Sequence, residues 1–219
     1  QVVQFRDSMT VKERARLFLL EDRRWRTPIQ RELFGQSVAA RVLALPEVAV
    51  ADTIALYVSS QEEVPTDALL NRLAEEPGRT VLLPAWVGSR WDFVVWRRED
   101  GLRPAKYGIP APSGPAWVPG GESAVAIVPV VGWGRSGLRV GRGGGHYDRL
   151  LGCLRSAVRL WVIGIAYEFQ RVLGLSMDEW DEPLDMVVTE RRVVRRQTLR
   201  RADSGAAEIA TGDRCDWEA

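Results

Sequence analysis

Apolar positions along the chain change their spacing after about the first fifty residues. Residues 11–20, and the segment that follows Thr27, carry apolar side chains at helical spacing. Thr27, Pro28 and Gln30 give the second segment a capping box with proline at the first helical position. We therefore predict one helix over 11–20 and a second from Pro28 to about residue 45.

Short apolar runs then alternate with helical segments. The runs have the length of strands and lie at 53–58, 80–83, 91–96, 124–128, 160–166 and 185–189. Thr66 is the predicted cap of a helix that stops at 77–78. Pro84 is the predicted end of the second strand, and we predict a further helix over 147–155. Strands with little alternation are typical of a parallel sheet covered on both faces, so the pattern predicts an α/β fold.

Two segments lack a regular pattern. Residues 101–122 are rich in proline and glycine and predict a loop within the domain. Residues 191–201 are rich in arginine, and the chain then becomes small and polar, so we expect one domain over 1–196 and a disordered tail over 197–219. The arginine-rich stretch favours a solvated edge strand, with docking to an acidic surface or RNA as the alternative.

Composition narrows the class of protein. The chain has 219 residues and a formal net charge of +1, a balance that argues against a nucleic-acid-binding protein. No apolar run is long enough to span a membrane. The 2 cysteines are too few for a disulfide framework, which favours the cytoplasm. A single histidine excludes a multi-histidine metal site, and Lys12 and Lys106 are the only lysines among 30 basic residues.

The segment 132–148 carries the clearest chemical signal. Half of its first fourteen positions are glycine, and it lies between a predicted strand and a predicted helix. Glycines let backbone N–H groups converge, and a helix N-terminus adds partial positive charge, so the layout favours phosphate binding over a flexible surface turn. Arg139 and Arg142 can grip phosphate oxygens, and Asp148 suits a magnesium ion between protein and phosphate.

Residues 137–148, GLRVGRGGGHYD, resemble the G-x-R-L-G-x-G-x-G-Y-Y-D signature of 5-formyltetrahydrofolate cyclo-ligase, also called methenyltetrahydrofolate synthetase. The likeness extends over 12–190. It includes KERAR at 12–16, YVSSQEEVPT at 57–66, YGIPAP at 107–112, AYEFQ at 166–170 and DEPLD at 181–185.

The resemblance implies a fold and a reaction. The fold would be a three-layer α/β sandwich with a mainly parallel sheet, similar to ribose-5-phosphate isomerase and CoA-transferase-like proteins. The reaction would use ATP and Mg²⁺ to convert 5-formyltetrahydrofolate to 5,10-methenyltetrahydrofolate by phosphorylating the formyl oxygen. The partner would be a small molecule, a reduced folate, with no nucleic acid and no membrane. The protein would be a monomer or homodimer.

The resemblance also gives roles to individual residues. Lys12, Arg139 and Arg142 would act in catalysis by neutralising the transferred phosphoryl group. The residues that would bind ATP are Lys12, Arg16, Arg139, Gly141, Arg142, Gly143, Gly144, Gly145, His146 and Tyr147. The residues that would bind the folate are Ser60, Glu63, Pro65, Tyr107 and His146. Asp148 and Asp181 would hold Mg²⁺.

Six positions depart from the family pattern. Pro65 and Gly134 stand where acids are usual, Ala111 stands where Glu or Gln is usual, and His146 replaces a tyrosine. Ser176 and Trp180 replace a proline and a polar residue ahead of Asp181. These departures leave two alternatives open. One is a divergent paralogue that applies the same ATP-driven activation to another formyl or amide substrate. The other is a non-catalytic nucleotide- or folate-binding regulator.

Overall fold

A seven-stranded sheet forms the centre of the computed structural model, which describes residues 9–60, 62–120 and 123–197. The strand order is β3-β2-β1-β4-β7-β8-β9, and a separate hairpin pairs β5 with β6. The strands are β1 (Thr53–Ala55), β2 (Thr80–Val87), β3 (Arg90–Trp96), β4 (Ser123–Pro129), β5 (Gly132–Trp133), β6 (Arg139–Val140), β7 (Arg159–Ile165), β8 (Met186–Val188) and β9 (Val193–Arg195). The five inner strands are parallel, and β3 and β9 close the two edges antiparallel.

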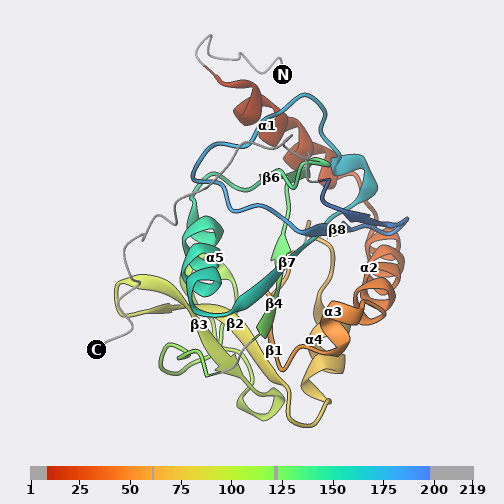
Figure 1. Cartoon of the computed structure of the whole chain (residues 1–219). Coiled ribbons are helices and arrows are strands. Elements are labelled where there is room, and N and C mark those ends of the chain that lie inside the picture. The colour runs from red at the N-terminus through yellow and green to blue at the C-terminus, as the bar shows by residue number, and fades with distance from the viewer. Residues whose placement is uncertain (1–8, 61, 121–122, 198–219) are drawn as a thin grey trace.

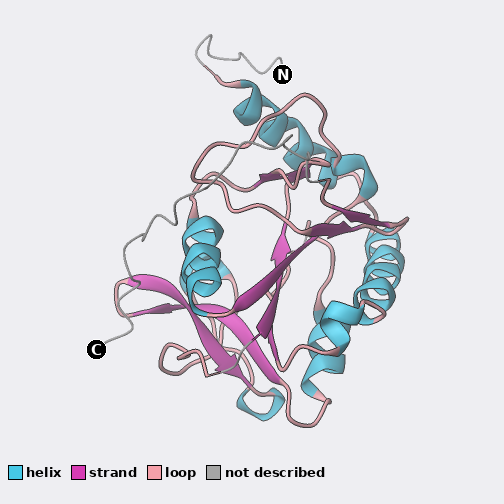
Figure 2. Cartoon of the chain, viewed as in Figure 1, coloured by secondary structure: helices cyan, strands magenta, loops and turns pink. Residues whose placement is uncertain are grey.

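Helices cover both faces of this sheet. The α-helices are α1 (Val11–Arg23), α2 (Pro28–Leu43), α3 (Pro46–Ala49), α4 (Asp67–Ala74) and α5 (His146–Ala157), with 3₁₀ turns η1 (Arg98–Asp100), η2 (Lys106–Gly108) and η3 (Glu168–Gln170). Figures 1 and 2 show α2, α3 and α4 on one side of the sheet and α5 on the other. The predicted three-layer α/β sandwich is confirmed. Among the described helices, none combines the length and the apolar character that a bilayer span requires.

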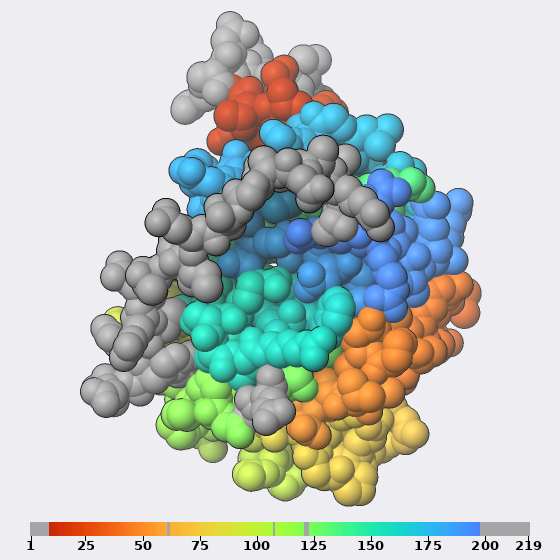
Figure 3. Space-filling model, viewed as in Figure 1, coloured from red at the N-terminus to blue at the C-terminus, as the bar shows by residue number. Residues whose placement is uncertain are grey.

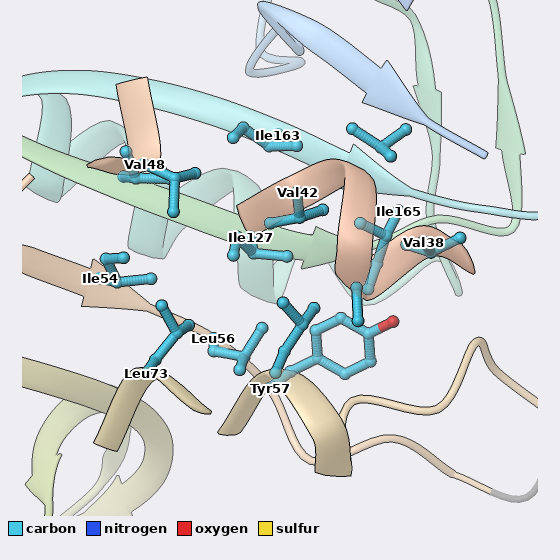
Figure 4. Packing of buried hydrophobic residues seen from close by; sticks show 14 of the residues in the cluster. Val38, Val42, Val48, Ile54, Leu56, Tyr57, Leu73, Ile127, Ile163 and Ile165 are labelled. Atoms are coloured by element: carbon cyan, nitrogen blue, oxygen red, sulfur yellow. The ribbon is translucent and has the colours of Figure 1, made fainter. Parts of the chain in front are cut away.

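Two apolar clusters hold the layers together. On one face, Val38 and Val42 of α2 and Leu73 of α4 point toward strand residues such as Ile54 and Ile127 (Figure 4). On the other face, leucines on one side of α5 (Leu150, Leu151 and Leu154) pack against residues of β4 and β7. Each fully buried side chain of this kind stabilises the fold by about 1.5–3 kcal/mol. These two clusters show which side of α2, α4 and α5 faces the sheet.

The first two helices begin as their sequences predict. Thr27 Oγ1 accepts a hydrogen bond from the Gln30 N–H at 3.2 Å, and Gln30 Oε1 accepts one from the Thr27 N–H at 3.0 Å. Thr10 and Glu13 form a second capping box at the start of α1. The α1 helix continues to Arg23, three residues past the predicted end, and Arg23 is buried.

Thr66 precedes α4 as predicted, but its side chain does not cap the helix. Its hydroxyl donates to the Tyr57 carbonyl at 2.8 Å and accepts the Ser59 N–H at 3.1 Å. Because both partners belong to the segment that leaves β1, Thr66 closes this loop back on itself. The hydroxyl therefore stabilises a loop that the sequence did not show.

The prediction that Pro84 ends the second strand is wrong, because β2 continues to Val87 with Pro84 opposite Phe93 of β3. The Thr80 N–H and the Leu82 carbonyl bind backbone groups of the β1 segment, so even-numbered residues of β2 direct their backbone groups to that side. Pro84 lies beyond the end of β1 on the same side. Proline has no backbone N–H to donate, but no described strand pairs with β2 on that side at Pro84, so the sheet loses no hydrogen bond.

The arginine-rich stretch contributes an edge strand. β9 pairs antiparallel with β8, and Arg195 binds Glu47 at 2.6 Å. The predicted strand over 185–189 is thus β8, the last but one in the chain. The predicted tail lies outside the described residues apart from Gln197. In the space-filling view, the surface of α5 adjoins that of the segment leading into β8 (Figure 3), where Arg155 binds Glu182 at 3.0 Å.

The connections leave a crevice between β1 and β4. After β1 the chain forms α4 on one face of the sheet, and after β4 it forms α5 on the other face. The two chain segments therefore diverge at the carboxyl ends of neighbouring parallel strands. In open α/β sheets, ligands bind at this kind of switch point.

We expect Leu73→Ala to lower the free energy of unfolding by about 2–5 kcal/mol, because it leaves a cavity between α4 and the sheet. Leu33→Ala is the matched control, since Leu33 is a helical leucine that is 56% exposed while Leu73 is 0% exposed. The control should change stability by less than about 0.5 kcal/mol. Urea denaturation of both variants measures the difference, and equal losses would contradict the assignment of the core.

Candidate active site

A cavity of about 650 Å³ opens at the crevice between β1 and β4. Its walls come from segments far apart in the sequence: the start of α1, the residues after β1 and β4, the glycine loop 141–145, the start of α5, and the loop 178–181. Apolar side chains such as Trp91, Ile109 and Leu150 complete the walls. The glycine-rich segment identified from sequence therefore faces a site of ligand size.

The glycine loop links β6 to the first turn of α5. Gly143 and Gly145 have φ angles of 98° and 62°, which residues with a Cβ adopt only at a cost. Gly145 is also the N-cap of α5, where no side chain makes a capping hydrogen bond. Arg16 Nε donates to the Gly141 carbonyl at 2.7 Å and so holds the loop against α1. The backbone N–H groups of the loop and the partial positive charge of the helix N-terminus together suit this wall to an anion.

Cations and acids alternate on the wall that α1, β6, α5 and the loop 178–181 share. Lys12 Nζ lies 2.5 Å from Asp181 Oδ2 and 2.9 Å from Asp178 Oδ2. Arg139 lies 2.5 Å from Asp148 Oδ1. The Glu182 N–H reaches the same Asp148 oxygen at 3.4 Å, which joins the two ion pairs into one network. We call these residues, with Glu182, the phosphate-side network.

The charges in this network shift the pKa of Lys12. Partial burial alone would lower this pKa, but hydrogen bonds to Asp178 and Asp181, together with their negative charges, outweigh the burial and raise it. Lys12 is therefore a fixed cation at the cavity wall. A fixed cation of this kind is suited to binding phosphate oxygens.

The carboxylates of Asp148 and Asp181 fit a magnesium ion that arrives with phosphates. Asp148 Oδ1 and Asp181 Oδ2 receive all the protein hydrogen bonds made to these groups within the described residues, so one oxygen of each remains for a metal. The described residues contain no group of three or more His, Cys, Asp or Glu that could hold a metal without help. Mg²⁺ is commonly held by one or two carboxylates plus substrate phosphates, which is the donor set present here.

Glu63 lies on the opposite wall, where the chain leaves β1. It is 8% exposed, its Oε2 accepts the Ser60 N–H at 2.9 Å, and its carbonyl accepts the Tyr167 hydroxyl at 3.0 Å. Burial, and then the charge of Glu63, raise the pKa of Tyr57 well above its usual value. Burial likewise raises the pKa of Tyr147. Both phenols therefore keep their protons and remain hydrogen-bond donors beside the carboxylate.

Arg142 connects the glycine loop to the segment after β1. Its guanidinium donates to Ser60 Oγ at 3.1 Å and to Glu63 Oε1 at 3.4 Å. Every arginine or lysine that the family signature assigned to catalysis is thus paired with an acid.

The structure gathers most of the predicted site residues in this cavity. Those that line it are Lys12, Arg16, Glu63, Arg139, Gly141, Arg142, Gly143, Gly144, Gly145, His146, Tyr147, Asp148 and Asp181. Ser60 contacts the cavity through Arg142 without lining it. Pro65 lies against Gly35 of α2 and does not line the cavity. Tyr107 lies in η2, and its side chain is outside the part of the chain that the structure describes.

Sequence reasoning missed three residues of the site. Asp178 binds Lys12, and only its spacing of three residues before Asp181 could have indicated it. Trp91 lines the cavity from an edge strand, whereas the sequence placed it only in a predicted strand. Gln170 falls in the AYEFQ motif, but its role was not apparent. It is fully buried, and its Nε2 donates to the carbonyls of Val130 and Val131 at 2.7 and 2.6 Å.

The six departures from the family pattern separate in space. Ala111, His146 and Trp180 line the cavity, whereas Pro65 and Ser176 do not. Gly134 lies in the turn between β5 and β6, where its N–H donates to the Leu138 carbonyl and a Cβ would lie 3.3 Å from the Leu138 side chain. Half of the departures therefore lie outside the cavity walls.

Comparison with known proteins agrees with this site. Residues 8–190 match the model of the 5-formyltetrahydrofolate cyclo-ligase family. The 5-formyltetrahydrofolate cyclo-ligase of Escherichia coli (strain K12) is 32% identical over 176 residues, which cover 78% of this chain and 96% of the relative. The enzyme of the same name from Mycolicibacterium smegmatis is 30% identical over 189 residues, which cover 83% of this chain and 94% of the relative.

A solved structure shows the same fold. The 5,10-methenyltetrahydrofolate synthetase of Aquifex aeolicus superposes with a TM-score of 0.74 at 28% identity, over 93% of this chain and 100% of that one. The sequence, the fold and the residues that line the cavity thus agree on one family. The chain belongs to the 5-formyltetrahydrofolate cyclo-ligase family.

Proposed function

We propose that this protein is an ATP- and Mg²⁺-dependent ligase that converts 5-formyltetrahydrofolate to 5,10-methenyltetrahydrofolate. The observation that carries the proposal is the single cavity in which the glycine loop and the phosphate-side network face Glu63 and an apolar wall. Such a cavity can hold a triphosphate and a flat, partly polar ring system side by side. The reaction consumes ATP, and we place it in the cytoplasm.

The proposed reaction explains why a phosphate site and a ring site lie together. The carbon of a formamide is a poor electrophile, and closing the new ring requires that its oxygen leave. When the formyl oxygen receives the γ-phosphoryl group of ATP, ADP is released and the oxygen becomes part of a leaving group. The N10 amine then attacks the carbon and gives up its proton, the C–O bond breaks, and inorganic phosphate departs with the oxygen and that proton. The reaction needs positioning and charge neutralisation more than a protein nucleophile.

The residues of the cavity supply this neutralisation. Lys12, Arg139 and Arg142 would compensate the charge on the triphosphate, and backbone N–H groups of the glycine loop would bind its oxygens. Asp148 and Asp181 would hold Mg²⁺, which supplies further positive charge to the phosphates when bound. Glu63 would bind polar groups of the folate ring from the opposite wall. The two alternative functions predict other outcomes. A divergent ligase would form a different product, and a non-catalytic binder would form none.

We expect the purified protein, mixed with Mg-ATP and 5-formyltetrahydrofolate, to form the conjugated methenyl product and one ADP per turnover. Absorbance measures the formation of the methenyl product, and a coupled enzymatic assay measures the release of ADP. A protein that releases ADP only with another formyl or amide compound is the divergent ligase. A protein whose melting temperature rises with ATP or folate, but which releases no ADP, is a binder, and either result would contradict the proposal.

We expect Asp148→Asn to raise the Mg²⁺ concentration needed for activity and to lower turnover. Losing a charged contact of this kind costs about 1.5–3 kcal/mol, or roughly 10- to 150-fold. Asp52→Asn is the matched control, since Asp52 is exposed and lies outside the cavity lining. A magnesium titration of both variants provides the measurement. Wild-type activity of Asp148→Asn at every concentration would remove this carboxylate from the metal site.

The single histidine gives the site a direct pH probe. Burial, and then the positive charges of Arg149 and Lys106, lower the pKa of His146 from its usual value of 6.5. The folded protein therefore binds the proton less readily than the unfolded chain. The imidazole is neutral at pH 7, and its contribution to stability is lost as the pH falls from 6.5 through the lowered pKa.

We expect the His146 resonance of the magnesium-free protein to titrate in NMR spectra with a midpoint below 6.5. Lys106→Gln should move the midpoint upward, because it removes one of the positive charges that oppose protonation. Arg159→Gln is the control, since Arg159 is exposed and lies outside the cavity lining. A midpoint at or above the usual value, or equal midpoints in the two variants, would contradict the electrostatic assignment.

A further inference from the structure

The ion pairs of the cavity differ in which segments they join. The Lys12–Asp181 and Arg139–Asp148 pairs both belong to the phosphate-side network. A ligand that replaces the acid in either pair therefore changes contacts on one wall only. The Arg142–Glu63 pair alone, among the ion pairs of described residues that line the cavity, joins the glycine loop to the segment after β1. It therefore connects the wall assigned to ATP with the wall assigned to the folate.

The two members of this pair are held very differently. The Glu63 side chain is 9% exposed, its Oε2 accepts the Ser60 N–H, and its backbone carbonyl accepts the Tyr167 hydroxyl. The Arg142 side chain is 55% exposed, and its described contacts are those made by one guanidinium nitrogen to Ser60 and Glu63. The arginine can therefore swing away while the carboxylate stays in place.

Both proposed ligands compete with this contact. A triphosphate in the glycine loop offers Arg142 stronger acceptors than a carboxylate at 3.4 Å, because charged phosphate oxygens accept bidentate hydrogen bonds. A folate that hydrogen-bonds to the Glu63 carboxylate competes with Arg142 for Oε1, because Oε2 already accepts the Ser60 N–H. A ligand that displaces the pair removes that cost for the other ligand.

We propose that Arg142 is a positioning residue that couples nucleotide binding to folate binding by leaving Glu63 for the triphosphate. This inference rests on the proposed function of the same cavity. The coupling is positive and reciprocal: each ligand raises the affinity for the other by the same factor. A half-exposed ion pair contributes up to about 1 kcal/mol, so the factor should be about two- to fivefold.

Calorimetry with the non-hydrolysable nucleotide Mg-AMP-PNP and with 5-formyltetrahydrofolate measures this coupling without turnover. In the wild type, saturating folate should tighten nucleotide binding about two- to fivefold, and nucleotide should tighten folate binding equally. Glu63→Gln should bind nucleotide alone about two- to fivefold more tightly than the wild type, because the charged competitor is gone. Its coupling factor should fall to one.

A second variant tests the inference from the folate side. Arg142→Ala should bind nucleotide more weakly, yet bind folate alone about two- to fivefold more tightly, as the wild type does with nucleotide present. Glu62→Gln is the matched control, because it removes a neighbouring ion pair, with Arg24 at 3.2 Å, outside the cavity lining. This control should keep the full coupling.

The outcomes separate this inference from the proposed function. Independent binding of the two ligands in the wild type, or coupling that persists in both Glu63→Gln and Arg142→Ala, overturns the role of Arg142 even if methenyl product forms. Loss of coupling in Glu62→Gln overturns it as well. Absence of folate binding in the wild type overturns the proposed function and the inference with it. Loss of coupling in the two cavity variants alone supports the inference.

Discussion

One buried amide links the carboxyl ends of the strands that form the cavity. Gln170 donates to the carbonyls of Val130 and Val131, just after β4, and its Oε1 accepts the Tyr167 N–H at 2.8 Å, just after β7. Tyr167 in turn reaches the carbonyl of Glu63, after β1. Gln170 thus joins the segments after β4 and β7, and Tyr167 extends the connection to the segment after β1, so the loops that they carry keep a fixed spacing.

This fixed frame explains how a site can be assembled from loops. Loops are usually the mobile part of an α/β domain, whereas proposed phosphoryl transfer needs reacting groups held in line. Here the capping box of Tyr167 and Gln170 turns the end of β7 into a rigid 3₁₀ turn, and Thr66 closes the loop after β1. The glycine loop is held in a different way, by the contact of Arg16 with the Gly141 carbonyl. The sheet and its buried polar contacts thus provide the wall of the cavity that this loop faces.

The paired charges of the cavity follow from the same burial. An isolated cation in a partly enclosed site loses hydration and gains nothing, so Lys12, Arg139 and Arg142 each have an acidic partner in this structure. The pairing keeps the ligand-free cavity stable, but it also makes every ligand displace an existing contact. Affinity is therefore lower than the number of cations suggests, and binding depends on which pairs are broken. The choice of ligand then depends on the acidic partners of these cations as much as on the cations themselves.

Local signals were the part of this structure that the sequence predicted well. The capping box of Thr27 and Gln30, the buried strands and the glycine segment before α5 all depend on residues within a few positions of one another. Features set by distant neighbours were missed: the continuation of β2 through Pro84 depends on where β1 ends. Ile29 and Leu33 have helical spacing yet are exposed, since spacing does not show whether another layer covers that side. Periodicity identifies an element, and only the packing decides what it faces.

The same limit applies to the departures from the family signature. Read along the chain, Pro65, Ala111, Gly134 and His146 look like equal losses from a folate pocket. In space, Gly134 belongs to a hairpin turn and Pro65 packs against α2, so neither changes the cavity wall. Ala111 is a small buried residue at the wall, and His146 keeps a ring beside Trp91, with centroids 6.0 Å apart. Of the departures from the family pattern, Ala111, His146 and Trp180 line the cavity, and His146 still carries an aromatic ring. The changes to the wall are therefore few, which favours the family's substrate over a different one.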